Sequence, residues 1–141
     1  MKLSTKGRYG LKAMLDIAIY GKEQCVSLKQ IAERQSLSEN YLEQLISLLK
    51  KAGLLKSTRG AQGGYTLSKN PEQITVGDIL RALEGSLAPV DCVLVNENKK
   101  CSDSNGCVTK FIWKKVTDSI NDVVDNITLR DLVDDHNNLN L

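Results

Sequence analysis

The sequence predicts a mainly α-helical fold that contains one small β-hairpin and ends in a long helix. Two helix starts of the same design follow each other closely, and two strand-like runs around a glycine-rich turn come directly after them. A long amphipathic stripe stands late in the chain. A hairpin directly after the second helix of a helix-turn-helix is the wing of a winged helix. We therefore predict a winged helix-turn-helix domain over residues 1–84, a cysteine-bearing loop over 85–107, and a dimerisation helix with a C-terminal tail over 108–141.

Composition and charge fit a single domain with a polyanionic partner. The chain has 141 residues, of which 41% are hydrophobic and 26% are charged, so it can bury one core. Residues 1–70 carry 12 Lys and Arg against 5 Asp and Glu, whereas residues 71–141 carry 7 against 12. The basic first half suggests a polyanion, the alternative being a chance scatter of solvated charges. Because no apolar run has transmembrane length and the first residues lack a signal-peptide pattern, we expect a cytoplasmic protein without membrane contact.

Three helices are expected in the first third of the chain. Apolar residues recur at helical spacing over about residues 4–20, and basic residues mark the start of this helix. Ser27 can cap the second helix, with Gln30 closing a capping box. Ser38 caps the third helix in the same way, and Gly53 can end it in a left-handed conformation. The short connection between the second and third helices makes them a helix-turn-helix candidate.

A hairpin and a short helix complete the predicted winged domain. Strand-like runs over about 54–58 and 64–67 flank a glycine-rich turn that begins with Arg59. Thr75 then caps a short helix, which ends before Gly85.

The last long helix is expected from Val108 to about Val124, followed by a final capped turn at Thr128. This helix could pack onto its own domain. We favour a symmetric dimer, because the apolar faces of the winged domain already match one another. The apolar stripe of the helix consists of Val108, Ile112, Trp113, Val116, Ile120, Val123 and Val124.

The helix-turn-helix and the wing offer residue types that bind DNA. Glu accepts a hydrogen bond from cytosine, Gln and Asn pair with adenine, and Tyr and Ser reach phosphates or bases. Taken alone, Glu43 is more simply a solvated surface residue. Arg59 stands at a glycine-rich turn that can approach a narrow minor groove. The predicted DNA contacts are Lys2, Ser4, Lys6, Arg8, Tyr9, Ser38, Asn40, Tyr41, Glu43, Gln44, Arg59, Gly60, Gln62 and Gly63.

Three of the four cysteines, Cys92, Cys101 and Cys107, fall in one polar segment. Thiolates this close in sequence can surround one soft metal centre, and iron–sulfur clusters take cysteine ligands; the alternative is three unrelated thiols on a loop. Zinc is disfavoured, because the chain has no Cys-x-x-Cys pair and a single histidine, His136. We expect Cys25 to be a small half-buried hydrophobe. The sequence shows no general base that could activate a nucleophilic cysteine, so we expect that the protein is not an enzyme.

Three segments closely resemble one family of winged-helix transcription regulators. They are "LSTKGRYGLKAMLDIA", "LSENYLEQLISLLKKAGLLKSTRGAQGGYTL" and "ITVGDILRALEG". The resemblance is to the IscR/NsrR/CymR-type regulators of the Rrf2 family, and it is closest to the cluster-binding IscR-like members. It implies a homodimer on a palindromic operator in double-stranded DNA, with the long helix as dimer arm. It also implies that Tyr41, Glu43 and Gln44 read bases, and that Arg59 and Gly60 enter the minor groove.

Cluster-binding members of this family carry three cysteines before the dimer helix, as this chain does. The resemblance therefore implies an iron–sulfur cluster, 2Fe-2S or 4Fe-4S, on the three loop cysteines. Its fourth ligand is open, since Lys110 stands where IscR-like proteins have His and Arg8 where NsrR-like proteins have Asp. The candidates are a small exogenous ligand, a loop oxygen such as that of Asp103 or Ser104, or a residue of the other subunit.

Three functions remain open at this point. The first is a regulator, expected to act as a repressor, that senses iron–sulfur status, oxygen or nitric oxide through the cluster. The second is a cluster-free regulator of the same fold that controls cysteine or sulfur metabolism through thiols or a metal. The third is a module that acts by docking a metabolic enzyme, although the basic first half argues against action without DNA.

Overall fold

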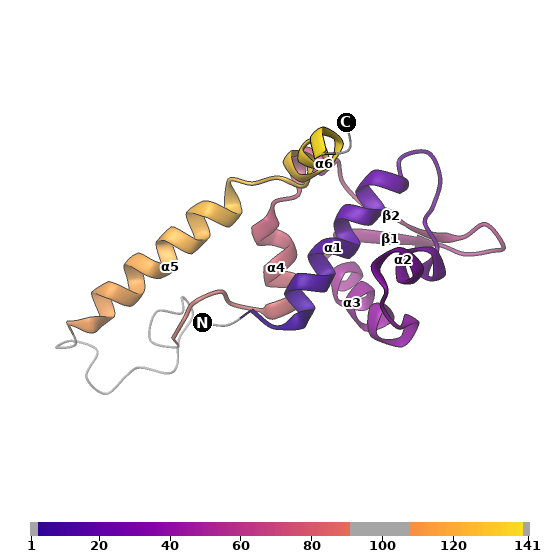
Figure 1. Ribbon diagram of the computed structural model, residues 1–141. Helices are drawn as coiled ribbons and strands as arrows, with labels where there is room; N and C mark the ends of the chain where they lie inside the picture. Colours follow the sequence, from indigo (N-terminus) through magenta and orange to yellow (C-terminus); the bar gives the residue numbers. More distant parts are fainter. Residues whose placement is uncertain (1–2, 91–107, 140–141) are drawn as a thin grey trace.

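The computed structural model describes residues 3–90 and 108–139 (Figure 1). A winged helix-turn-helix domain forms one body, and a long helix extends away from it on the side opposite the hairpin. This arrangement confirms the predicted fold class. The elements, in chain order, are α1 (Thr5–Tyr20), α2 (Leu28–Gln35), α3 (Glu39–Lys51), β1 (Leu55–Thr58), β2 (Gly64–Leu67), the 3-10 helix η1 (Pro71–Gln73), α4 (Val76–Glu84), α5 (Thr109–Asp125) and α6 (Leu129–Leu139).

The predicted caps fix both helices of the helix-turn-helix. The Ser27 hydroxyl accepts from the Gln30 N–H at 3.2 Å, while the Gln30 side chain accepts from the Ser27 N–H at 2.9 Å. Ser38 accepts from the N–H of Tyr41 at 3.2 Å. Gly53, with φ of 80°, takes the left-handed conformation expected after α3. The helix starts could be predicted because these hydrogen bonds join residues only three positions apart.

The wing is tied to the segment that precedes α2. Strands β1 and β2 pair antiparallel from Leu55↔Leu67 to Thr58↔Gly64. Beyond them, Val26 and Tyr65 exchange two backbone hydrogen bonds, of 3.0 and 2.8 Å. A side chain at position 64 would overlap the backbone of Val26, so this close approach requires glycine.

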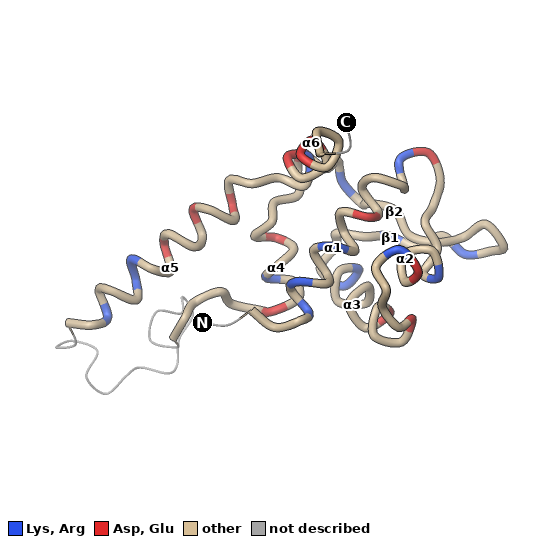
Figure 2. Tube along the Cα trace, in the orientation of Figure 1, with Lys and Arg blue, Asp and Glu red and all other residues tan. Residues whose placement is uncertain are grey.

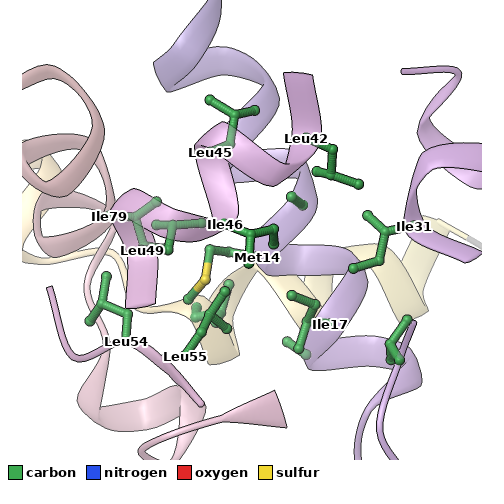
Figure 3. Packing of buried hydrophobic residues seen from close by; sticks show 14 of the residues in the cluster. Met14, Ile17, Ile31, Leu42, Leu45, Ile46, Leu49, Leu54, Leu55 and Ile79 are labelled. Atoms are coloured by element: carbon green, nitrogen blue, oxygen red, sulfur yellow. The ribbon is translucent and has the colours of Figure 1, made fainter. Parts of the chain in front are cut away.

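One hydrophobic core joins the helices of the winged domain. Met14 of α1 lies in its centre, among side chains of α3 and the wing (Figure 3). The largest fully buried side chains are Met14, Ile17, Val26, Ile31, Leu42, Leu45, Ile46, Leu49, Ile74, Ile79 and Leu129. Because α3 contributes four of them, its orientation is set by the core, and its polar face is left outside.

The predicted C-terminal tail is instead a helix that belongs to this core. Thr128 does form a cap, with its hydroxyl accepting from Asp131 N–H at 3.1 Å, but α6 continues for 11 residues. Leu129 and Val133 of α6 are buried in the core of the winged domain. The Leu129 N–H donates to the Ile74 carbonyl at 2.8 Å. The chain thus returns to the winged domain after α5. The sequence of this short segment predicts its cap but not its packing against distant elements.

The stripe of α5 divides into two halves with different environments. Ile120 and Val124 pack against α4 of their own chain, in a cluster with Val76 and Leu80. The half nearer the start of α5 keeps large apolar side chains exposed, including Phe111, Ile112 and Trp113. Own-domain packing, weighed above as the alternative to a dimer, therefore holds for the second half of the helix. None of the helices within residues 3–90 and 108–139 is long and apolar enough to cross a membrane.

Candidate nucleic-acid interface

The outer face of α3 is polar along its first half. Leu42, Leu45, Ile46 and Leu49 are buried beneath it. The exposed positions are Glu39, Asn40, Glu43, Gln44 and Ser47. Base-reading side chains on a recognition helix need this arrangement, with free polar groups near the helix N-terminus and a buried opposite face. The predicted contacts Ser38, Asn40, Glu43 and Gln44 all lie at this end of α3.

Tyr41 joins the start of α3 to the start of α1. Its hydroxyl lies 2.9 Å from the Thr5 hydroxyl, and its ring meets that of Tyr9 edge to face, with centroids 6.3 Å apart. Arg8 and Lys12 lie within cation–π distance of the Tyr9 ring, at 5.9 and 5.7 Å. Tyr41 is therefore half-buried and acts as a structural link as well as a predicted DNA contact.

This link brings basic side chains of α1 beside the recognition helix. Lys6 shares a shallow hollow with Asn40, Glu43 and Gln44. Arg8 and Lys12 are exposed on the same helix. A row of cations next to base-reading groups suits phosphate contacts that position a recognition helix. The predicted residues Lys6 and Tyr9 thus meet those of α3, although about 35 positions separate them in the chain, and Arg8 lies over the Tyr9 ring.

Ser4, a predicted DNA contact, forms hydrogen bonds within the protein. It caps α1, accepting from the Lys6 N–H at 3.2 Å, and its hydroxyl donates to the carboxylate of Glu84. Glu84 also accepts from the Gly7 N–H at 2.7 Å. Burial of the Glu84 carboxyl would raise its pKa, but hydrogen bonds from Ser4 and Gly7 outweigh burial and lower it. The end of α4 therefore anchors the first turn of α1.

The wing presents Arg59, Gly60 and Gln62 at its exposed tip, which projects from the body of the protein (Figure 1). Gly60 has a φ of 113°, a conformation that favours glycine, and its carbonyl accepts from the Gly63 N–H at 3.0 Å. A side chain at Gly63 would overlap the carbonyl of Thr58. The glycines therefore build a narrow tip that carries one guanidinium.

Several features of this surface escaped prediction. Lys12 could have been found, because it stands one helical turn after Arg8 and shares its face. Lys50 and Lys51 end α3 with positive charge. The contact between Thr5 and Tyr41 has no local signal in the sequence, because it joins two helices that are distant in the chain.

The predicted metal ligands Cys92, Cys101 and Cys107 lie outside the described residues, as does Lys2. Within residues 3–90 and 108–139, no group of three or more His, Cys, Asp or Glu side chains could hold a metal ion. Cys25 is a free, half-buried thiol, as expected.

An exposed polar helix seated on a helix-turn-helix, a row of cations beside it and a narrow cationic wing define a DNA-binding transcription regulator. Comparison with known proteins identifies the group. The family Rrf2, described as "Iron-dependent Transcriptional regulator", matches residues 3–135. The chain belongs to the Rrf2 family.

Relatives of two kinds match at similar levels. The chain is 47% identical over 132 residues to the HTH-type transcriptional regulator CymR of Bacillus subtilis, covering 94% of this chain and 89% of that protein. It is 43% identical over 141 residues to the regulator IscR of Pectobacterium atrosepticum, covering 100% and 84%. Because these relatives are named transcriptional regulators, the expectation that the chain is not an enzyme is confirmed.

Solved structures agree with both kinds. The structure of T. potens IscR matches with a TM-score of 0.76 and 53% identity, over 96% of this chain and 88% of that one. The structure of CymR, the global cysteine regulator of B. subtilis, also matches with a TM-score of 0.76, at 46% identity, over 95% and 97%.

Proposed function

We propose that two copies of this chain bind a palindromic operator together. In this complex the start of α3 enters the major groove, where Tyr41, Glu43 and Gln44 read bases, and Arg59 of the wing enters the minor groove. Lys6 and Arg8 contact phosphates beside the recognition helix. The proposal is supported by the exposed polar face of α3 and by the cations that Tyr41 brings next to it.

The dimer forms through the exposed half of α5. Phe111 is 66% exposed and Ile112 is 53% exposed, which is unusual for neighbouring large apolar side chains on a helix. The lysines of α5 lie in its first half and the aspartates in its second half (Figure 2). Antiparallel pairing of two α5 helices along their whole length would set Phe111 and Ile112 of one copy toward the exposed Val123 of the other. It would also bring the basic half of one copy beside the acidic half of the other, which favours a second copy as the partner.

The signal is iron–sulfur status, held through Cys92, Cys101 and Cys107. The observation that carries this proposal is the donor set itself, because three thiolates in one segment of 16 residues suit an iron–sulfur cluster better than any other common centre. When bound, the cluster would supply iron that reacts with oxygen or nitric oxide. The family description as iron-dependent fits this proposal.

A second candidate is a cluster-free regulator of cysteine or sulfur metabolism. Lys110, in the first turn of α5, stands where the resemblance implies a histidine ligand, and an ammonium cannot take that role. The similarity to CymR of B. subtilis is of the same order as that to the IscR proteins. In this case the loop cysteines would act as thiols, or a docked partner enzyme would carry the signal.

Anaerobic purification decides between the two candidates. The cluster proposal predicts visible-region absorbance together with bound iron and sulfide, lost in each of Cys92→Ala, Cys101→Ala and Cys107→Ala but kept in the control Cys25→Ala. Binding to a duplex selected from a random pool should change in the three loop variants and not in the control. Colourless protein that takes up no iron on reconstitution, and that binds the duplex unchanged without the loop cysteines, would favour the cluster-free regulator.

A further inference from the structure

A polar clamp joins α4 to α5 beside their apolar contact. Arg81 of α4 donates from Nη1 to Asp125 Oδ1 at 2.7 Å and from Nη2 to Asp125 Oδ2 at 2.9 Å. The same Nη2 donates to Asn121 Oδ1 at 2.7 Å. One guanidinium thus holds two residues, one turn apart, at the end of α5. Two fixed points on a helix restrict its direction as well as its position.

Gly77 makes room for this clamp. It lies in α4 one turn before Arg81, where glycine destabilises a helix relative to alanine. A side chain at Gly77 would overlap the carboxylate of Asp125 and lie 2.7 Å from Arg81 Nη1. The absent side chain therefore lets Asp125 approach α4 closely. The hydrogen bond from Arg81 is also the main reason that the pKa of Asp125 is lowered, so the carboxylate is charged at neutral pH.

The position of the clamp gives small rotations a large effect. From Asn121 to the start of α5 at Thr109 the helix spans about 18 Å, at about 1.5 Å per residue. A tilt of about 10° at the clamp would move that end by about 3 Å. This displacement is close to the rise of about 3.4 Å between successive base pairs. A small change in the angle of α5 is therefore large enough to change the preferred operator spacing by one base pair.

We propose that Arg81, with Asn121 and Asp125, is a positioning residue that sets the angle of α5 to the DNA-binding domain and thereby the half-site spacing that the dimer accepts. This inference rests on the proposed dimer bound to a palindromic operator. A simpler role, surface stabilisation, would be weak, because the Arg81 and Asp125 side chains are 36% and 43% exposed. The two roles differ in what they do to spacing, so spacing is the property to measure.

The test uses the full chain and a duplex that the wild-type dimer selects from a random-sequence pool. Derivatives carry one or two base pairs added to or removed from the centre, and a further duplex carries one half-site alone. The variants are Arg81→Gln and Asp125→Asn. The matched control is Arg130→Gln, which breaks a 3.1 Å pair with Asp134 within α6 and leaves the hydrogen bonds between Arg81 and α5 in place. Light scattering and thermal melting check that every variant is a folded dimer.

We expect the wild type and Arg130→Gln to bind one spacing much better than the others. In Arg81→Gln and Asp125→Asn this preference should fall by about tenfold, while affinity for the single half-site stays unchanged. The double variant should lose no more than either single variant, because both break the same clamp. Preferences equal to wild type in both variants would overturn the inference and leave the proposed function standing. A pool that yields no palindrome would overturn both.

Discussion

Glu84→Gln tests how the end of α4 anchors the first turn of α1. The carboxylate of Glu84 accepts from the Gly7 N–H at 2.7 Å, from the Ser4 N–H at 3.4 Å and from the Ser4 hydroxyl. All three donors belong to the first turn of α1, where a negative charge also favours the positive end of the helix dipole. Gln keeps the shape but has one acceptor oxygen and no charge.

The cost can be worked out from these contacts. In Glu84→Gln at least one donor loses its acceptor, and the other donors lose a charged acceptor. A hydrogen bond to a charged group contributes about 1.5–3 kcal/mol to stability. The lost charge at the helix N-terminus adds about 0.3–1 kcal/mol. Because Gln can still accept from Gly7, we expect the free energy of unfolding to fall by about 1–2 kcal/mol at neutral pH. DNA affinity should fall as well, since Lys6 and Thr5 lie in the same turn.

The stability difference between wild type and Glu84→Gln should depend on pH. The pKa of Glu84 is lower in the folded protein than its ordinary value of 4.5, so its stabilisation is complete above that value and is lost as pH falls through the folded pKa. Urea unfolding should therefore separate Glu84→Gln from wild type at about pH 7, and the difference should shrink as the pH falls below 4.5 through the folded pKa of Glu84. Glu23→Gln, at an exposed loop position, is the control. A difference that stays constant across this range would refute the role assigned to the charge.

Four further substitutions test other parts of the molecule. Leu129→Ala should lower the free energy of unfolding by about 2–5 kcal/mol in urea titrations, because a fully buried side chain of α6 is lost. A change below about 1 kcal/mol would contradict the packing of α6 in the core. Asp16→Ala removes a 2.8 Å pair with Arg34 and should cost about 2 kcal/mol by the same measurement, since Arg34 is partly solvated. Arg59→Ala should reduce the slope of DNA affinity against salt by about one unit, whereas Glu43→Ala should relax discrimination at one base pair by about 1–3 kcal/mol; equal losses on all sequences would contradict base reading by Glu43.

Features encoded in a few neighbouring residues could be predicted from the sequence. The capping residues Ser27, Ser38 and Thr75 are confirmed because each bonds a backbone group three residues away, and such geometry depends only on the local chain. For the same reason, Gly53 is confirmed with a positive φ and Gly85 is confirmed as the residue that ends α4.

Features that join distant segments could not be predicted in this way. The pairing of Val26 with Tyr65 and the docking of Leu129 in the core depend on how helices pack, and no short pattern encodes either one. The stripe of α5 was recognised correctly as an apolar face, but periodicity alone cannot say what covers it. In the structure, Ile120 and Val124 pack against α4, whereas Ile112 is exposed.

For the DNA-binding surface, residue types indicated the class of ligand, and the fold supplied the arrangement. Tyr41 belongs to a short segment typical of the family, from which the resemblance predicts a DNA contact. Its hydrogen bond to Thr5, which brings Lys6 to the recognition helix, arises from helix packing.

The short helix α4 has two polar contacts that point to different parts of the protein. Glu84 at its end holds the first turn of α1, which carries Lys6 and touches Tyr41 of the recognition helix. Arg81, one turn earlier, holds the end of α5, whose other half is the proposed dimer surface. The cysteine-bearing segment follows α4 directly in sequence and precedes α5. Under the proposed function, a change in that segment would act on the end of α4 or the start of α5, the two helices that carry the contact with α1 and the proposed dimer surface.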